Sequence, residues 1–255
     1  MTLVVRSAGV TDVGKVRKHN EDALLIADDV GLYVVADGMG GHAGGEVASA
    51  ESIDQIRSMV KNGKDVVEAL RRENTEDNRG AARRLVESAI QAATYMVFAM
   101  AEQDPARKGM GTTISTLLFV GPIAIVGQVG DSRVYLIRGG IPVQITEDHT
   151  LVNLQIKAGA LTREQARTVP YQNLITRAVG VKDYVEVDTF DLECRGGDRF
   201  VLCSDGVHGY IEDENELSPL CATPNNELCA RQLVSHALQR GGRDNATAIV
   251  VDVIG

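Results

Sequence analysis

The chain has 255 residues, 44% apolar and 24% charged, a composition typical of a globular protein. At this length one fold buries roughly 75% of the surface that its unfolded chain exposes, so no disulfide is needed to stabilise it. The net charge of −9 disfavours nucleic acid or an anionic membrane as the main partner, because both attract a positively charged surface.

The four cysteines, Cys194, Cys203, Cys221 and Cys229, favour an intracellular protein. The sequence has no Cys-x-x-Cys pair, and no pair of histidines lies near them at the spacing of a zinc site. So few cysteines in a chain of this length predict reduced thiols. No apolar stretch approaches the ~20 residues of a membrane span, and the N-terminus lacks a signal-peptide pattern. We therefore expect a cytoplasmic protein with neither a membrane nor nucleic acid as partner.

Short apolar runs predict strands, which in chain order cover 24–27, 32–36, 114–120, 123–129, 134–137, 200–203 and 246–253. Gly139-Gly140 predicts a hairpin turn into a further strand at 141–145. The three runs between 114 and 137 follow one another with no room for a crossover helix. They are therefore predicted to form an antiparallel run.

Amphipathic helices are predicted in three segments. The apolar residues of 79–101, and less strongly those of 45–60, recur at the three- and four-residue spacing of a half-buried helix. A third helix at 226–239 is closed by Gly241-Gly242. The charged segment 61–80 predicts a short helix in a solvated connection. Without a repeat or a boundary, these elements predict one domain, 1–255, with packed sheets and helices outside.

Several aspartates lie at the ends of apolar strands. Asp37, Asp131 and Asp205 each follow one, and Asp244 precedes the last. An Asp-Gly pair after a strand is most often only a turn. A buried carboxylate is costly, however, unless it is paired or bound to a metal. Four such positions, joined by Asp22, predict a carboxylate cluster around hard divalent cations, since all-oxygen ligands favour Mg²⁺, Mn²⁺ or Ca²⁺.

A phosphate-binding residue is predicted next to the first of these aspartates. Arg17 precedes Asp22 by five residues, and a guanidinium can hold two phosphate oxygens at once. Taken alone, the same segment would equally fit a charged surface turn. Gly38 is a further candidate ligand, because a glycine beside Asp37 lets its backbone carbonyl approach an ion.

These pieces occur in a fixed order along the chain: Arg17-x-x-Asn20-Glu21-Asp22, Asp37-Gly38-Met39-Gly40-Gly41-His42, Gly111-Thr112-Thr113, Gly130-Asp131-Ser132-Arg133-x-Tyr135, Ser204-Asp205-Gly206 and Gly242-x-Asp244-Asn245-x-Thr247. No single motif is decisive, but the ordered set resembles the type 2C (PPM) family of metal-dependent Ser/Thr protein phosphatases, in its compact bacterial form. The resemblance covers about 6–253. It implies an α/β fold, a four-layer αββα sandwich of two antiparallel sheets flanked by helix pairs.

The resemblance also implies a centre of two Mn²⁺ or Mg²⁺ ions, with a third, weaker metal site. Its implied ligands are Asp37 bridging both ions, the Gly38 carbonyl on one of them, Asp205 and Asp244 on the first, Asp22 on the second and Asp131 on the third. Glu21 and Asn245 would hold these ligands in position without binding the ions themselves. The two ions would acidify a water and hold the phosphoryl oxygens for in-line attack.

Two further roles follow from the resemblance. Arg17 would neutralise the phosphoryl oxygens, and His42 is the candidate acid for the leaving oxygen, because imidazole titrates near neutral pH. An ordinary loop histidine is the alternative for His42. The segment 148–180 resembles the family's flap, a mobile segment beside the site. After Gly206 the family more often has Leu than Val207, and His208 is unusual there.

The predicted function is hydrolysis of phosphoserine and phosphothreonine in proteins, reversing a Ser/Thr protein kinase. Tyrosine-phosphatase chemistry needs an arginine six residues after its cysteine, where Cys203 has Gly209 and Cys194 has Phe200. A metal-dependent phosphodiesterase or nuclease is disfavoured by the net charge of −9. A non-catalytic phosphoprotein-binding module is the alternative from another class, and the presence of every expected ligand disfavours it.

Overall fold

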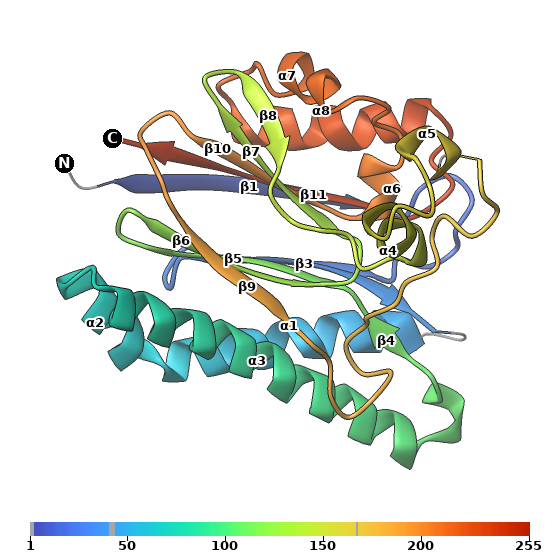
Figure 1. The fold of residues 1–255 in the computed structure, drawn as a ribbon, viewed down its shortest axis with the longest axis horizontal. Helices are drawn as coiled ribbons and strands as arrows, with labels where there is room; N and C mark the ends of the chain where they lie inside the picture. The colour runs from blue at the N-terminus through green and yellow to red at the C-terminus, as the bar shows by residue number, and fades with distance from the viewer. Residues whose placement is uncertain (1–2, 41–43, 167) are drawn as a thin grey trace.

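Two antiparallel sheets pack face to face and carry helices on both outer sides in the computed structural model, which describes residues 3–40, 44–166 and 168–255 (Figure 1). This order of layers confirms the expected αββα sandwich. No helix in the described ranges is long and apolar enough to cross a membrane.

The strands and α-helices have the following bounds. The strands are β1 (Val4–Asp12), β2 (Asp22–Ala27), β3 (Leu32–Met39), β4 (Gly111–Thr112), β5 (Ile114–Val120), β6 (Ile123–Val129), β7 (Arg133–Arg138), β8 (Ile141–Gln144), β9 (Asp188–Glu193), β10 (Arg199–Cys203) and β11 (Ala246–Ile254). The α-helices are α1 (Gly44–Asn62), α2 (Lys64–Arg72), α3 (Glu76–Gln103), α4 (Leu151–Lys157), α5 (Arg163–Ala166), α6 (Asp205–His208), α7 (Leu217–Leu220) and α8 (Asn226–Gln239).

The strands form two sheets, which we name sheet A and sheet B. Sheet A has the order β1-β11-β10-β7-β8, and sheet B has the order β2-β3-β5-β6-β9, with β4 paired to β3. All of these pairs are antiparallel. In both sheets the central strands are the apolar ones, so that each is buried on both faces.

Three apolar layers hold the sandwich together. Between the sheets, Phe119 lies edge to face with Tyr33 and with Phe200, at ring-centroid distances of 5.8 and 5.4 Å. The outer face of sheet B packs on α1, α2 and α3, and that of sheet A packs on α8. The outer layers are unequal, because α1 and α3 form a long pair whereas α8 is accompanied by the short helices α6 and α7 (Figure 1).

The predicted antiparallel run of three strands between 114 and 137 is wrong in one respect. β5 and β6 do form a hairpin in sheet B, but β7 lies in sheet A between β10 and β8. A short connection excludes a parallel return to the same sheet, but it allows a step to the facing sheet. Gly130, with φ of 96°, makes that step, and a side chain there would overlap the Thr113 side chain.

The apolar patterns did not predict β1 and β9. Each is an edge strand with mostly half-exposed residues, and β9 carries three acidic side chains among its six residues. Charged, weakly apolar edges protect a sheet from pairing with other chains, and for the same reason they lack the signature of a buried strand. The predicted helices are confirmed, and the four cysteines are free, as expected, and also buried.

Candidate active site

Asp22 and Asp37 lie opposite each other on neighbouring strands of sheet B. Asp22 begins β2, and the antiparallel register pairs it directly with Asp37 near the end of β3. Directly opposed residues project from the same face of a sheet. The backbone of Asp37 is fixed by Thr113, whose Oγ1 accepts from the Asp37 N–H at 3.0 Å and whose N–H donates to the Asp37 carbonyl at 2.8 Å.

Sheet A brings a further carboxylate to the same place. Asp205 follows β10 and begins α6. Besides burial, the charges of Asp22 and Asp205 raise the pKa of Asp37, so the carboxyl groups of Asp37 and Asp205 lie close together across the two sheets. Gly206 allows the close approach of the last strand, because a side chain at this position would overlap the Asn245 carbonyl oxygen. Asp131, buried at 5% exposure, lies in the step from sheet B to sheet A.

Arg17 and Asp244 form an ion pair at the rim of this group. Arg17 donates from Nη2 to Asp244 Oδ2 at 2.7 Å, with the side chains 50% and 36% exposed. Asn245 fixes the loop that carries Arg17. Its Oδ1 accepts from the Glu21 N–H at 2.8 Å, and its Nδ2 donates to the carbonyls of Val13 and His19, both at 2.9 Å.

Burial and mutual repulsion raise the pKa values of these carboxyl groups. Burial, reinforced by the charges of Asp205 and Asp244, raises the pKa of Asp22 to about 7. Burial and then Asp205 raise the pKa of Asp131 to about 7. For Asp37, burial followed by Asp22 and Asp205 holds the pKa well above its usual range. Such a group of coupled carboxyls is typical of a functional site.

One oxygen of Asp22 is fully bonded and the other is not. Oδ2 accepts from Ser204 Oγ and from Thr247 Oγ1, both at 2.7 Å. Because the Thr247 proton points at Asp22, the Thr11 hydroxyl 2.7 Å away must donate to Thr247, and Thr11 accepts in turn from Asn20. Oδ1 is buried without a hydrogen-bond partner among the described residues.

This donor set fits a hard divalent cation. No three His, Cys, Asp or Glu side chains in the described ranges are grouped as a compact metal site, and Asp22 and Asp244 each engage other partners. Nevertheless, the buried, unpaired Asp22 Oδ1 and the repulsion among Asp22, Asp37, Asp131 and Asp205 are what a divalent cation would relieve. The donors are oxygens, as Mn²⁺ and Mg²⁺ prefer.

Two other predicted residues support this group, and one cannot be placed. A side chain at Gly38 would overlap the carbonyl oxygens of Gly45 and Glu21. The backbone at Gly38 therefore packs against these two residues at a distance that requires glycine. Burial raises the pKa of the Glu21 carboxyl, while Arg17 and the Gly45 backbone lower it. His42 lies outside the described residues.

The flap segment 148–180 is anchored at both ends beside the carboxylates. Arg133, directly after the step from sheet B to sheet A, donates to Asp148 from two nitrogens, with Nη2 to Oδ2 at 2.6 Å. Thr150 pairs with Ile175, and Val179 pairs with Thr112 next to β3. In Figure 1 the flap helices α4 and α5 lie at the same end of the sandwich as α6.

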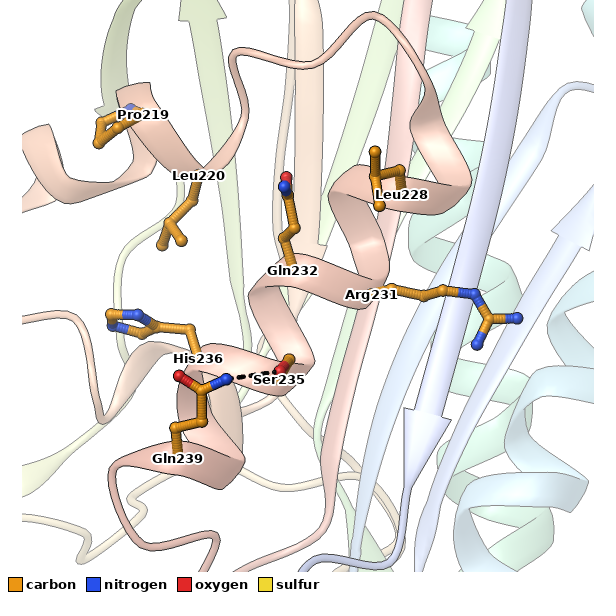
Figure 2. Close-up of a pocket in the computed structure, with 8 residues that line it drawn as sticks. All are labelled: Pro219, Leu220, Leu228, Arg231, Gln232, Ser235, His236 and Gln239. Carbon is orange, nitrogen blue, oxygen red and sulfur yellow. Dashed lines mark hydrogen bonds between the residues drawn. The ribbon is translucent and has the colours of Figure 1, made fainter.

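A separate hollow of about 420 Å³ lies on the outer side of sheet A (Figure 2). Its lining residues come from α7 and α8 and the segments next to them: Pro219, Leu220, Leu228, Arg231, Gln232, Ser235, His236 and Gln239. None of the site carboxylates contributes to it, so this hollow is distinct from the candidate active site.

Comparison with known proteins places the chain in a family. The sequence profile of the family described as protein phosphatase 2C matches residues 15–240. The chain belongs to the protein phosphatase 2C family. The predicted family resemblance is therefore confirmed.

Two of its relatives in this family are bacterial phosphatases. The chain is 38% identical over 254 residues to the serine/threonine protein phosphatase PstP of Mycobacterium tuberculosis (strain H37Rv), covering 100% of this chain but 46% of PstP. It therefore spans about half the length of that relative. Over 245 residues it is 32% identical to the serine/threonine phosphatase stp of Listeria innocua, covering 95% and 93% of the two chains.

A solved structure also matches along the whole chain. The catalytic domain of the serine/threonine protein phosphatase PstP, in complex with 2 manganese ions, superposes with a TM-score of 0.83 at 36% identity, covering 100% of both chains. This similarity confirms the fold class for the present member of the protein phosphatase 2C family.

The sequence motifs of this member of the protein phosphatase 2C family did not reveal that two hydroxyl groups bind Asp22. Ser204 and Thr247 stand inside the Ser-Asp-Gly and Asp-Asn-x-Thr motifs, but nothing in those motifs says which group they bond. They lie 182 and 225 residues from Asp22 along the chain. A hydroxyl residue beside a candidate ligand is a usable signal, but its partner can only be found from the fold.

Proposed function

We propose that this protein hydrolyses phosphoserine and phosphothreonine in proteins with the help of two Mn²⁺ or Mg²⁺ ions, and that it opposes a Ser/Thr protein kinase. The observation that carries the proposal is the meeting of Asp37 from sheet B with Asp205 from sheet A, beside Asp22 and Asp131. A carboxylate group at a cross-sheet junction is costly to fold, which argues for a role in ion binding.

The ligand assignment is part of the proposal. The residues that would hold the ions are Asp37, the Gly38 carbonyl, Asp205 and Asp244 together with Asp22, and Asp131 would serve a third, weaker site. Glu21 and Asn245 support them: Asn245 joins three backbone groups of the loop between β1 and β2. Bound metal ions would stabilise the negative charge of the phosphoryl oxygens and lower the pKa of a metal-bound water molecule.

Arg17 would bind the phosphoryl group. Its guanidinium is half-exposed at the rim of the carboxylates and, among the residues that the structure describes, donates from Nη2 to Asp244. Its other nitrogens can donate to two phosphoryl oxygens at once, which orients the phosphorus toward the carboxylate group. His42 stays the proposed proton donor to the leaving oxygen.

The remaining parts of the proposal concern the whole protein. Residues 1–255 would form one catalytic domain, since the two sheets share a single apolar layer formed by residues of both. Phosphorylated proteins would be its partners, selected beside the flap at 148–180, and the cytoplasm its location. The relatives named as serine/threonine phosphatases support this choice of substrate class.

The deciding experiment measures hydrolysis of a phosphothreonine peptide with Mn²⁺ and with EDTA, for the wild type, Asp37→Asn and Asp205→Asn. We expect activity that requires metal and falls at least about 100-fold in both variants. Asp54→Asn, an exposed position on α1, is the matched control and keeps full activity. Activity in EDTA, or in both variants, would contradict the proposal.

Two other outcomes would point to the alternatives. Preferential cleavage of bis-p-nitrophenyl phosphate over the monoester would indicate a phosphodiesterase. Tight binding of the phosphopeptide without turnover, in the presence of Mn²⁺, would indicate a non-catalytic phosphoprotein-binding module.

A further inference from the structure

Several side chains donate hydrogen bonds to the backbone of the step from sheet B to sheet A. Buried Gln128 donates from Nε2 to the carbonyls of Gly130 at 3.1 Å and Ser132 at 2.7 Å. His208 donates from Nε2 to the Asp131 carbonyl at 2.9 Å. Because these bonds bracket Asp131 on both sides, the position of its carboxylate depends on the partners of this short segment.

His149 is the partner that comes from the flap. Its backbone N–H donates to the Gly130 carbonyl at 2.9 Å, and its ring Nδ1 accepts from the Gly130 N–H at 3.1 Å. His149 thus bonds both backbone polar groups of the glycine directly before Asp131. The side chain is 6% exposed, and its ring has little freedom to leave this arrangement.

The contact with Gly130 also decides the tautomer of His149. Since Nδ1 accepts a hydrogen bond from the backbone, the ring proton must be on Nε2, which lies 3.0 Å from Asp188 Oδ2 and donates to it. Burial lowers the pKa of His149, in agreement with a neutral ring. The imidazole therefore connects the Gly130 amide to the Asp188 carboxylate through its two nitrogens.

Asp188 leads back to the other arm of the flap. Its Oδ1 accepts from Arg177 Nη1 at 2.7 Å, and Arg177 also pairs with Glu186 at 2.8 Å. The neighbouring Thr176 N–H donates to the His149 carbonyl at 2.8 Å. A continuous chain of contacts thus runs from the flap arm at 175–177 through Asp188 and His149 to the backbone beside Asp131.

We propose that His149 is a positioning residue that couples the placement of the flap to the placement of Asp131. The inference rests on the proposed function, in which Asp131 binds a metal ion and the flap borders the substrate. The two ring nitrogens act separately, because Nδ1 fixes the Asp131 segment and Nε2 fixes the flap arm through Asp188. Coupling of this kind is reciprocal, so an ion held at Asp131 must also steady the flap arm.

Two substitutions separate the contributions of the two nitrogens. His149→Asn places a carboxamide oxygen near the position of Nδ1 and retains the acceptor for Gly130, but is too short to reach Asp188. His149→Gln reaches Asp188 with its amide nitrogen and loses the acceptor for Gly130. Asp188→Asn, at a side chain that is 38% exposed, weakens the flap contact without altering the buried ring.

The test measures amide hydrogen exchange at Gly130 and Thr176 with and without Mn²⁺, together with Mn²⁺ affinity by calorimetry. In the wild type we expect Mn²⁺ to slow exchange at both amides. In His149→Gln the Gly130 amide exchanges at least about 10-fold faster and Mn²⁺ affinity falls about 10-fold. In His149→Asn and in Asp188→Asn, Mn²⁺ still protects Gly130 but no longer protects Thr176.

The outcomes separate this inference from the proposed function. Unchanged protection of Thr176 by Mn²⁺ in His149→Asn and Asp188→Asn would overturn the coupling and leave His149 as a packing residue only. Identical behaviour of His149→Asn and His149→Gln would overturn it as well. A wild-type protein that binds no Mn²⁺ would instead overturn the proposed function on which the inference rests.

Discussion

Asp22 and Asp37 lie directly opposite each other on β2 and β3, and the pKa of Asp37 is raised by burial and then by the charge of Asp22. The pair is therefore a local source of instability that the rest of the fold offsets. The same residues are the proposed metal ligands, so the instability and the function have one origin.

The contribution of Asp22 to the stability of the metal-free protein is predicted to fall as pH rises. Burial raises the pKa of Asp22 to about 7 from its ordinary value of 3.8. Between these two values the folded state keeps a proton that the unfolded chain has released, so the free energy of unfolding decreases with increasing pH. One pKa unit corresponds to about 1.4 kcal/mol, which gives an upper limit of about 4 kcal/mol.

Urea unfolding in EDTA at about pH 5 and about pH 8 measures this dependence. Asp22→Asn should flatten it and be the more stable protein at the higher pH, whereas the exposed control Asp54→Asn should follow the wild type. Mn²⁺ at about 100 times its dissociation constant should restore about 2.7 kcal/mol to the wild type. Equal pH slopes for Asp22→Asn and the wild type would refute the prediction.

The Thr247 hydroxyl is predicted to matter for metal binding as well as for stability. Thr247→Val removes a donor to Asp22 Oδ2, which lies at 2.7 Å, and should weaken Mn²⁺ binding about 10-fold. Thr116→Val is the matched control, because this buried threonine donates to the Gly127 carbonyl, at 3.3 Å, a group that is not a proposed metal ligand. Both variants should lose about 1–2 kcal/mol of stability. Calorimetric titration with Mn²⁺ should separate them, and equal affinities would contradict the proposed support of Asp22.

Two glycine-to-alanine changes are predicted to act in opposite directions. Gly206→Ala would place a methyl group on the Asn245 carbonyl, so the turn after Asp205 must shift and stability should fall by about 2 kcal/mol or more. At Gly80, within α3, the nearest atom to an added methyl group is the end of the Arg84 side chain at 3.3 Å. Gly80→Ala should therefore stabilise the protein by about 0.5–1 kcal/mol, from the helix propensity alone. Thermal unfolding of the two variants checks both signs.

His208 is predicted to limit stability in acid. Burial and the nearby Arg133 lower its pKa from 6.5 to about 3. Between these values the unfolded chain binds a proton that the folded protein does not, so the free energy of unfolding decreases as pH falls from 6.5 toward 3. His208→Gln keeps a donor for the Asp131 carbonyl and should reduce the decrease in the free energy of unfolding at acidic pH. His19→Gln, at an exposed position, should not alter it. Unfolding at about pH 4 and about pH 7 compares the variants.

The site could be predicted from the sequence to the extent that its residues occupy strand ends. A buried apolar strand can be recognised from its own residues. The ends of β3, β6, β10 and β11 therefore indicated the aspartates next to them, which are Asp37, Asp131, Asp205 and Asp244. Arg17 and Asp22 were indicated by their position close to each other in the sequence, and the family's fixed motif order then gave them their roles. The edge strands β1 and β9 carried no such signal, because half-exposed, charged strands have no continuous apolar face.

The sequence by itself determined the family, the order of the layers and the identity of the candidate ligands, because local periodicity and motif spacing are properties of neighbouring residues. Only the tertiary structure decided that β7 steps into sheet A, that Ser204 and Thr247 share one oxygen of Asp22, and that His149 holds Gly130. These contacts join residues far apart in the chain across two packed sheets. Their geometry depends on how the sheets face each other, which no local pattern encodes.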